Sequence, residues 1–76
     1  METPSTSSAR GNPFGLTARE IDVLRLVTQG LTTTQIAEQL TISPRTADAH
    51  LRSIYSKLEV TSRAAATRSA IEHELI

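Results

Sequence analysis

The chain has 76 residues, 8 of them basic and 8 acidic, and its formal net charge at pH 7 is zero. This length allows one small domain and leaves little room for an enzyme cleft with its supporting residues. The absence of Cys excludes disulfides and thiolate metal sites, and 2 His residues are too few for an ordinary zinc site. No apolar run approaches the ~20 residues of a membrane span, and the N-terminus lacks the apolar core of a signal peptide. We therefore expect a cytoplasmic protein with no membrane partner and no metal.

The charges are unevenly distributed along the chain. Residues 16–42 contain 2 basic and 3 acidic residues, a net charge of −1, whereas residues 43–70 contain 5 basic and 2 acidic residues, a net charge of +3. The second half of the chain is therefore modestly basic, which permits binding to nucleic acid but does not require it.

Residues 1–15 differ in composition from the rest of the chain. They are rich in Ser, Thr, Pro and Gly and show no apolar periodicity. Such a composition is typical of flexible segments, so we expect a disordered tail or linker at residues 1–15 and one folded domain at residues 16–76. Phe14 is open to two interpretations, as part of the tail or as a cap on the apolar edge of the domain.

Three helix starts share one design. Thr17 followed by Glu20 forms a capping box, and apolar residues at 16 and 21 stand at the flanking staple positions. Residues 31–36 repeat the pattern, with Thr as the cap and Gln three residues later. At the third start, Ser43 is the cap and Pro44 stands at the first helical position, where its missing N–H costs nothing.

The apolar periodicity predicts four helices, over about residues 18–29, 33–40, 44–58 and 62–72. Gly30 suits a left-handed cap at the end of the first helix. The alanines of the last helix have two interpretations, close helix packing or a flat dimer surface. The predicted fold class is all-α.

The second and third helices are joined by a turn of about three residues, which is the helix-turn-helix geometry. The third helix then has an inner stripe that faces the core: Ala47, His50, Leu51, Ile54 and Leu58. Its outer stripe consists of Arg45, Asp48, Ala49, Arg52 and Ser56. We interpret His50 as a half-buried packing residue rather than a catalyst.

The outer stripe carries side chains that suit the edges of DNA bases. Arg52 suits a bidentate pair with guanine, Ala49 suits a thymine methyl group, and Asp48 suits the amino group of cytosine. The free N–H groups at the start of this helix suit a phosphate. A charged outer stripe taken alone is more often a solvated face, and Asp48 repels phosphate.

Residues 16–71, about three quarters of the chain, resemble a LuxR-type helix-turn-helix domain. The resemblance rests on three motifs, LTxRExxVLxLVxxG, xxIAxxLxIS and TxxxHLxxIxxKLxV. Sigma factors share the first two motifs, but the His50-Leu51 and Lys57-Leu58 pattern is similar to LuxR-type proteins and unlike sigma factors. The resemblance implies a four-helix domain that is the DNA-binding output domain of LuxR- or FixJ-like bacterial transcription regulators.

The resemblance also implies roles for individual residues. Asp48, Ala49 and Arg52 match the base-reading positions of the family. The positions that face the DNA backbone are matched by Thr34, Arg45, Thr46 and Lys57. The helix by which such domains dimerise on DNA is matched by Ala64, Thr67, Arg68 and Ile71. Double-stranded DNA is the implied partner, bound by two copies on an inverted repeat, with no cofactor and no small-molecule ligand in this domain.

The sequence departs from the family pattern at four positions. The family often has cations at the positions of Asp48 and Thr34, a Val at that of Ala47 and a Gly at that of Glu59. These departures affect the expected affinity and target sequence more than the expected fold.

Two other classes of function are weighed against DNA binding. One is a protein-interaction module that kept the fold and lost affinity for DNA, with RNA polymerase or a partner regulator as its target. The other is an enzyme, which we do not expect, because the sequence shows no nucleophile–base pair, metal cluster or phosphate-binding Gly loop.

Overall fold

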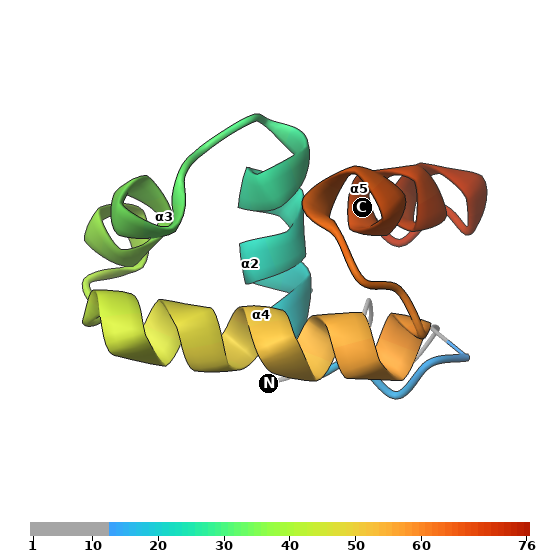
Figure 1. The fold of residues 1–76 in the computed structure, drawn as a ribbon, viewed down its shortest axis with the longest axis horizontal. Helices are drawn as coiled ribbons and strands as arrows, with labels where there is room; N and C mark the ends of the chain where they lie inside the picture. The colour runs from blue at the N-terminus through green and yellow to red at the C-terminus, as the bar shows by residue number, and fades with distance from the viewer. Residues whose placement is uncertain (1–12) are drawn as a thin grey trace, which may run out of the picture.

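The computed structural model describes residues 13–76, which form four α-helices: α2 (Ala18–Thr28), α3 (Thr33–Leu40), α4 (Pro44–Leu58) and α5 (Arg63–Glu72) (Figure 1). The all-α fold class is confirmed, and each helix begins and ends within one residue of its predicted bounds. The tail predicted at residues 1–15 lies largely outside the described residues. None of the described helices is long and apolar enough to cross a membrane.

Helix α2 lies at the centre of the domain and packs against the three other helices. α3 and α5 lie on opposite sides of α2, and α4 runs along one edge and touches all three (Figure 1). Within the described residues α3 and α5 share no packed interface. The buried apolar core consists of Leu16, Ile21, Val23, Leu24, Val27, Ile36, Ala37, Ala47, Leu51, Ile54, Leu58, Ala66, Ala70 and Leu75.

Each described helix begins with a hydroxyl side chain that accepts a backbone N–H from its first turn. Thr17 accepts from the Glu20 N–H at 3.1 Å, and the Glu20 carboxylate accepts the Thr17 N–H at 2.9 Å, which confirms the first capping box. Thr32 and Gln35 form the second box, with distances of 3.1 and 2.8 Å. The caps of α2 to α5 are Thr17, Thr32, Ser43 and Ser62.

Each described helix is also followed by a residue in the left-handed region and then by an apolar residue that packs on the core. The left-handed residues are Gly30 (φ 87°), Thr41 (φ 58°), Glu59 (φ 59°) and Glu74 (φ 53°). After α3 the Thr41 N–H donates to the Glu38 carbonyl at 3.3 Å and the Ile42 N–H donates to the Ala37 carbonyl at 2.9 Å, the two bonds of a Schellman motif. The same two bonds recur after the other helices. The apolar residues that follow are Leu31, Ile42, Val60 and Leu75.

Phe14 lies against the apolar core instead of extending away from it. Its side chain is half-buried, and its ring meets that of His73 edge-on, with centroids 5.0 Å apart and an interplanar angle of 73°. The edge-to-face geometry is a favoured arrangement of aromatic rings. Of the two interpretations of Phe14, the structure therefore supports the cap on the apolar edge.

Replacing Glu59 with Gly is expected to stabilise the domain by about 0.5–1 kcal/mol. A left-handed residue with a Cβ costs about 1–2 kcal/mol, part of which is offset by the larger backbone entropy of Gly in the unfolded chain. The free energy of unfolding, measured by urea denaturation, checks this prediction. Glu59→Ala is the matched control, since it keeps the Cβ, and a stabilisation by Ala as large as that by Gly would show that strain is not the cause.

Candidate nucleic-acid interface

Helix α4 is seated on the core by one face only. Ala47, Leu51, Ile54 and Leu58 are buried and His50 is half-buried, as the inner stripe predicted. The apolar positions recur at spacings of three and four residues, so they fall on one side of the helix. This seat fixes the rotation of α4 about its own axis and leaves the opposite face in solvent.

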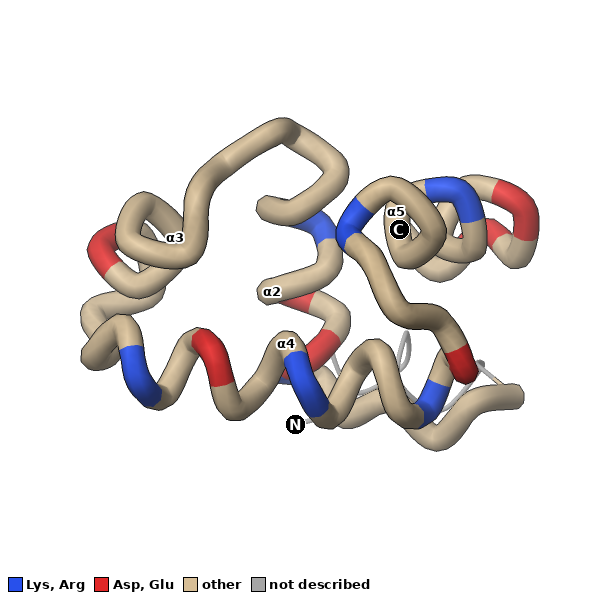
Figure 2. Tube along the Cα trace, viewed as in Figure 1, with Lys and Arg blue, Asp and Glu red and all other residues tan. Residues whose placement is uncertain are grey.

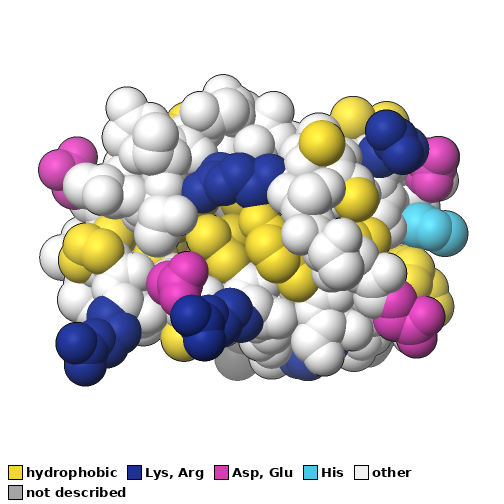
Figure 3. All heavy atoms as spheres, viewed as in Figure 1, with side chains coloured by type: hydrophobic (Ala, Val, Ile, Leu, Met, Phe, Trp, Pro, Cys, Tyr) yellow, Lys and Arg dark blue, Asp and Glu magenta, His cyan; other side chains and the backbone are white. Residues whose placement is uncertain are grey.

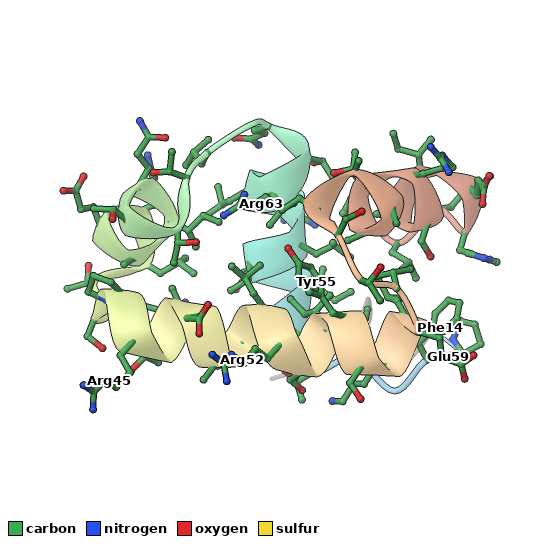
Figure 4. The ribbon with its side chains drawn as sticks, viewed as in Figure 1. Phe14, Arg45, Arg52, Tyr55, Glu59 and Arg63 are labelled. Carbon is green, nitrogen blue, oxygen red and sulfur yellow. The ribbon has the colours of Figure 1, made fainter. Side chains whose placement is uncertain are left out.

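The opposite face of α4 is continuous and exposed. All five residues of the outer stripe are exposed, and its last residue lies 11 positions after its first, about 16 Å along the helix axis. In Figure 4 the side chains of Arg45 and Arg52 point away from the core on this side of α4. Figure 2 shows one acidic position between basic positions along α4, so the stripe is not uniformly positive. The members of the outer stripe are Arg45, Asp48, Ala49, Arg52 and Ser56.

An ion pair on the outer stripe links Asp48 and Arg52. Arg52 Nε lies 3.0 Å from Asp48 Oδ2, and the two side chains are 82% and 51% exposed. Figure 3 shows a basic and an acidic side chain in contact on the surface of α4. Sequence reasoning treated the two residues separately, although their spacing of four residues on a helix is the signal that predicts such a pair.

The first turn of α4 has fewer free N–H groups than its position suggested. Pro44 has no N–H, and the N–H groups of Thr46 and Ala47 donate to the side chain and the carbonyl of Ser43. The Arg45 amide is left as the first-turn N–H for which the described residues provide no acceptor. The Ser43 hydroxyl donates to Thr46 Oγ1 at 2.9 Å, and both side chains are exposed. An anion here would meet one amide, two hydroxyls and the Arg45 guanidinium.

The start of α3 is held in place by Arg63, a residue whose role sequence reasoning missed. Arg63 Nη1 donates to the Leu31 carbonyl at 2.7 Å, and Nη2 donates to Thr33 Oγ1 at 2.9 Å. Its side chain runs from the start of α5 across the middle of the domain towards α3 (Figure 4). Arg63 thus connects two helices that do not pack on each other, and it leaves the neighbouring Thr34 exposed.

Lys57 lies at the far end of α4 and faces inward. Its Nζ donates to Glu20 Oε1 at 2.7 Å and to the Gly15 carbonyl at 3.1 Å, and its side chain is 32% exposed. Ser53, one turn earlier, donates to Glu20 Oε2 at 2.6 Å. The carboxylate of Glu20, whose side chain is 7% exposed, is thereby enclosed by groups from α2 and α4.

The pKa of Glu20 results from two opposing effects. Burial of the carboxyl group is the largest single effect and raises its pKa. The hydrogen bonds from Lys57, Ser53 and the Thr17 amide, together with the positive charge of Lys57, lower the pKa, and their sum exceeds the effect of burial. The balance places the pKa of Glu20 below its ordinary value of 4.5. The folded domain therefore holds Glu20 ionised at neutral pH.

The residues predicted for dimerisation lie on α5. Ala64, Arg68 and Ile71 are exposed and Thr67 is half-buried. Ile71 is 61% exposed, an unusual environment for a large apolar side chain. Ala66 and Ala70 are buried, which confirms close helix packing as one use of the alanines. The described residues contain no group of three side chains that could hold a metal ion.

The family model of the bacterial regulatory proteins of the luxR family, GerE, matches residues 15–70. The chain belongs to the LuxR family. It is 50% identical over 60 residues to the nitrate/nitrite response regulator protein NarP of Escherichia coli, covering 78% of this chain and 28% of that protein. It is 44% identical over 73 residues to the transcriptional activator protein ExaE of Pseudomonas putida, covering 96% of this chain and 34% of that protein.

A solved structure of a response regulator is similar to this chain in both fold and sequence. The crystal structure of the response regulator ChrA of a heme-sensing two-component system superposes with a TM-score of 0.80 and 41% identity, over 93% of this chain and 35% of that chain. The LuxR-family chain thus spans about a third or less of these three relatives. It is a helix-turn-helix DNA-binding domain of a transcription regulator. Among its four described helices, α3 and α4 are the pair joined by a short turn. The family consists of regulatory proteins, which confirms that the chain is not an enzyme.

Replacing Glu20 with Gln is expected to remove part of the acid sensitivity of the LuxR-family domain. Because the pKa of Glu20 is lowered on folding, its stabilising contribution is present above pH 4.5 and is lost as the pH falls through the folded value. Gln retains the capping box, as Gln35 does in α3, but not the ion pair with Lys57. At pH 7 we expect Glu20→Gln to lower the free energy of unfolding by about 1–2 kcal/mol.

Urea denaturation between pH 7 and pH 3 measures this effect, and the difference between the variant and the wild type should shrink as the pH falls. Glu38→Gln is the matched control, because Glu38 is exposed on α3 and has no ion pair among the described residues. A difference that stays constant down to pH 3 would assign the loss to altered packing rather than to charge.

Proposed function

We propose that α4 is the recognition helix of this LuxR-family domain and lies in the major groove of double-stranded DNA. The observation that carries the proposal is the division of α4 into a buried face and an exposed stripe about 16 Å long. A major groove ~12 Å wide admits one α-helix, and a helix seated on a core presents its outer face in one fixed orientation. In this arrangement Arg52 and Ala49 meet base edges.

Contacts with phosphates come from the start of each helix of the pair. The Arg45 guanidinium and the hydroxyl of Thr46 lie at the start of α4, and Thr34 lies in the first turn of α3. Lys57 has three N–H donors, two of which already have acceptors, so it offers at most one to a phosphate. Lys57 therefore contributes less to binding than the exposed cation of Arg45.

We also propose that two copies bind an inverted repeat through α5. The exposed side chains of Ala64, Arg68 and Ile71 recur at spacings of four and three residues, so they share one side of α5, which suits a second copy of the same helix. A two-fold pair of helix-turn-helix domains places its recognition helices in half-sites about one helical turn apart. Because the domain is small and the exposed side of α5 offers little area for a dimer, we expect a monomer in free solution at low concentration and a dimer on DNA.

A fluorescence-anisotropy titration with a random pool of short duplexes, at two salt concentrations, tests the proposed function. The wild type should bind more weakly at the higher salt, because phosphate contacts release counterions. Arg52→Ala should lose about 1–3 kcal/mol on the duplex selected from the pool and much less on random duplexes, with one base position relaxed. Equal binding of both proteins to both kinds of duplex would remove Arg52 from the interface.

A folded wild type that binds no duplex at low salt would contradict DNA binding by this chain. That result would favour the protein-interaction module. The zero net charge and the acidic residue at position 48 are the observations that support this alternative.

The dimer is tested with Ile71→Gln, which removes apolar surface from α5 without changing the charge. On a duplex with the full inverted repeat we expect its affinity to fall on the order of 10-fold or more, because the second copy no longer assists the first. On a single half-site its affinity should equal that of the wild type. Ile76→Gln is the matched control, since Ile76 is 44% exposed and lies beyond the end of α5. A tight dimer of the wild type without DNA, seen by sedimentation, would contradict coupling of dimerisation to DNA.

A further inference from the structure

We propose that Asp48 is a positioning residue for Arg52, so that the two side chains act as one unit that selects guanine at a single base position. This inference rests on the proposed function of α4. It gives Asp48 a role that neither a phosphate contact nor an independent base contact describes. The observation behind it is the ion pair between Arg52 Nε and Asp48 Oδ2, 3.0 Å apart on the outer stripe.

The geometry of the pair determines which donors of Arg52 remain available. A guanidinium has one N–H on Nε and two on each Nη. Asp48 lies against the Nε edge, and no hydrogen bond within the described residues involves either Nη of Arg52. The two Nη atoms form a fork that matches the O6 and N7 acceptors of guanine in the major groove. The pair therefore leaves Arg52 the donors that recognise guanine and engages the nitrogen nearest the helix.

The pair also restricts where the guanidinium can lie. An Arg side chain that is 82% exposed has several flexible torsions and reaches phosphates as readily as bases. A carboxylate one helical turn earlier restrains it on the side of α4 that faces the groove. Arg45, three residues before Asp48, has no such partner among the described residues. The outer stripe thus contains one restrained and one unrestrained cation.

Charge gives the pair a second effect. A lone Arg is attracted to every phosphate irrespective of sequence, whereas an Arg and Asp pair carries no net charge. The neutral pair loses attraction for the DNA backbone but keeps its N–H donors for a base. Asp48 therefore lowers affinity for random DNA more than it lowers affinity for a duplex with guanine in register. In free solution the exposed pair contributes little to stability, so Asp48 can be replaced without unfolding the domain.

The experiment compares the wild type with Asp48→Ala, Asp48→Asn and Asp48→Glu, and uses Arg45→Ala as the matched control. Each folded protein is used to select duplexes from a random pool, and its affinity for the selected and random duplexes is then measured by anisotropy at several salt concentrations. The melting temperature, monitored by circular dichroism, should be the same for the Asp48 variants and the wild type.

Asp48→Ala and Asp48→Asn are expected to bind random duplexes about 3- to 10-fold more tightly than the wild type. In a plot of the logarithm of affinity against the logarithm of salt concentration, their slope should become more negative by up to about 0.9, the value for one additional phosphate contact. They should also lose most of the preference for guanine at one position. Asp48→Glu keeps a carboxylate within reach of Arg52 and should restore that preference. Arg45→Ala should weaken binding to all duplexes alike and leave the selected sequence unchanged.

Two results would overturn the role of Asp48 while the proposed function stands. If Asp48→Ala keeps the guanine and loses cytosine at a neighbouring position, Asp48 reads a base itself. If the selected sequence and the salt dependence of Asp48→Ala equal those of the wild type, the pair does not persist on DNA. A folded wild type that binds no duplex overturns the proposed function and, with it, the role of Asp48.

Discussion

A helix as short as α3, with 8 residues, leaves about half of its backbone N–H and C=O groups without a partner inside the helix. In this domain the constraint is met in the same way at every described helix: a hydroxyl cap at the start and a left-handed residue at the end. The apolar residue after each left-handed turn then packs on the core. Satisfying the helix ends therefore also supplies part of the core, which matters for a chain with little apolar surface to bury.

Glu20 extends this end-capping into the tertiary structure. The carboxylate that accepts the Thr17 N–H also accepts from Ser53 and Lys57, so the cap of α2 is bonded to two turns of α4. Arg63 does the same for α3, because it holds the loop before that helix from the start of α5. Helices α3 and α4 are thus oriented by polar contacts at their edges as well as by the apolar seat of α4.

The features predicted from sequence are those whose signal lies within a few residues. The capping boxes, the proline at the start of α4, the glycine after α2 and the two faces of α4 all depend on spacings of one to four residues. The bonds of Glu20 to Ser53 and Lys57 and of Arg63 to Leu31 join residues more than 30 positions apart, and no local pattern marks them. The left-handed turns after α3, α4 and α5 were not predicted from the residues themselves, because no glycine stands there. Only the Gly that the family has at the position of Glu59 indicated one of them. The roles of individual residues at the DNA interface stay predictions.

The distribution of contacts explains how a domain with zero net charge serves as a DNA-binding domain. Of the cations in the second half of the chain, Lys57 is neutralised by Glu20 and Arg63 is occupied by α3, so both are used to hold the fold. Arg52 is offset by Asp48, which leaves Arg45 as the exposed cation of the outer stripe without an ion-pair partner among the described residues. The outer stripe therefore carries little net positive charge to attract the DNA backbone. If α4 reads base edges as proposed, nonspecific affinity supplies less of the binding free energy, and the fit of α4 to the bases and the proposed second copy supply more.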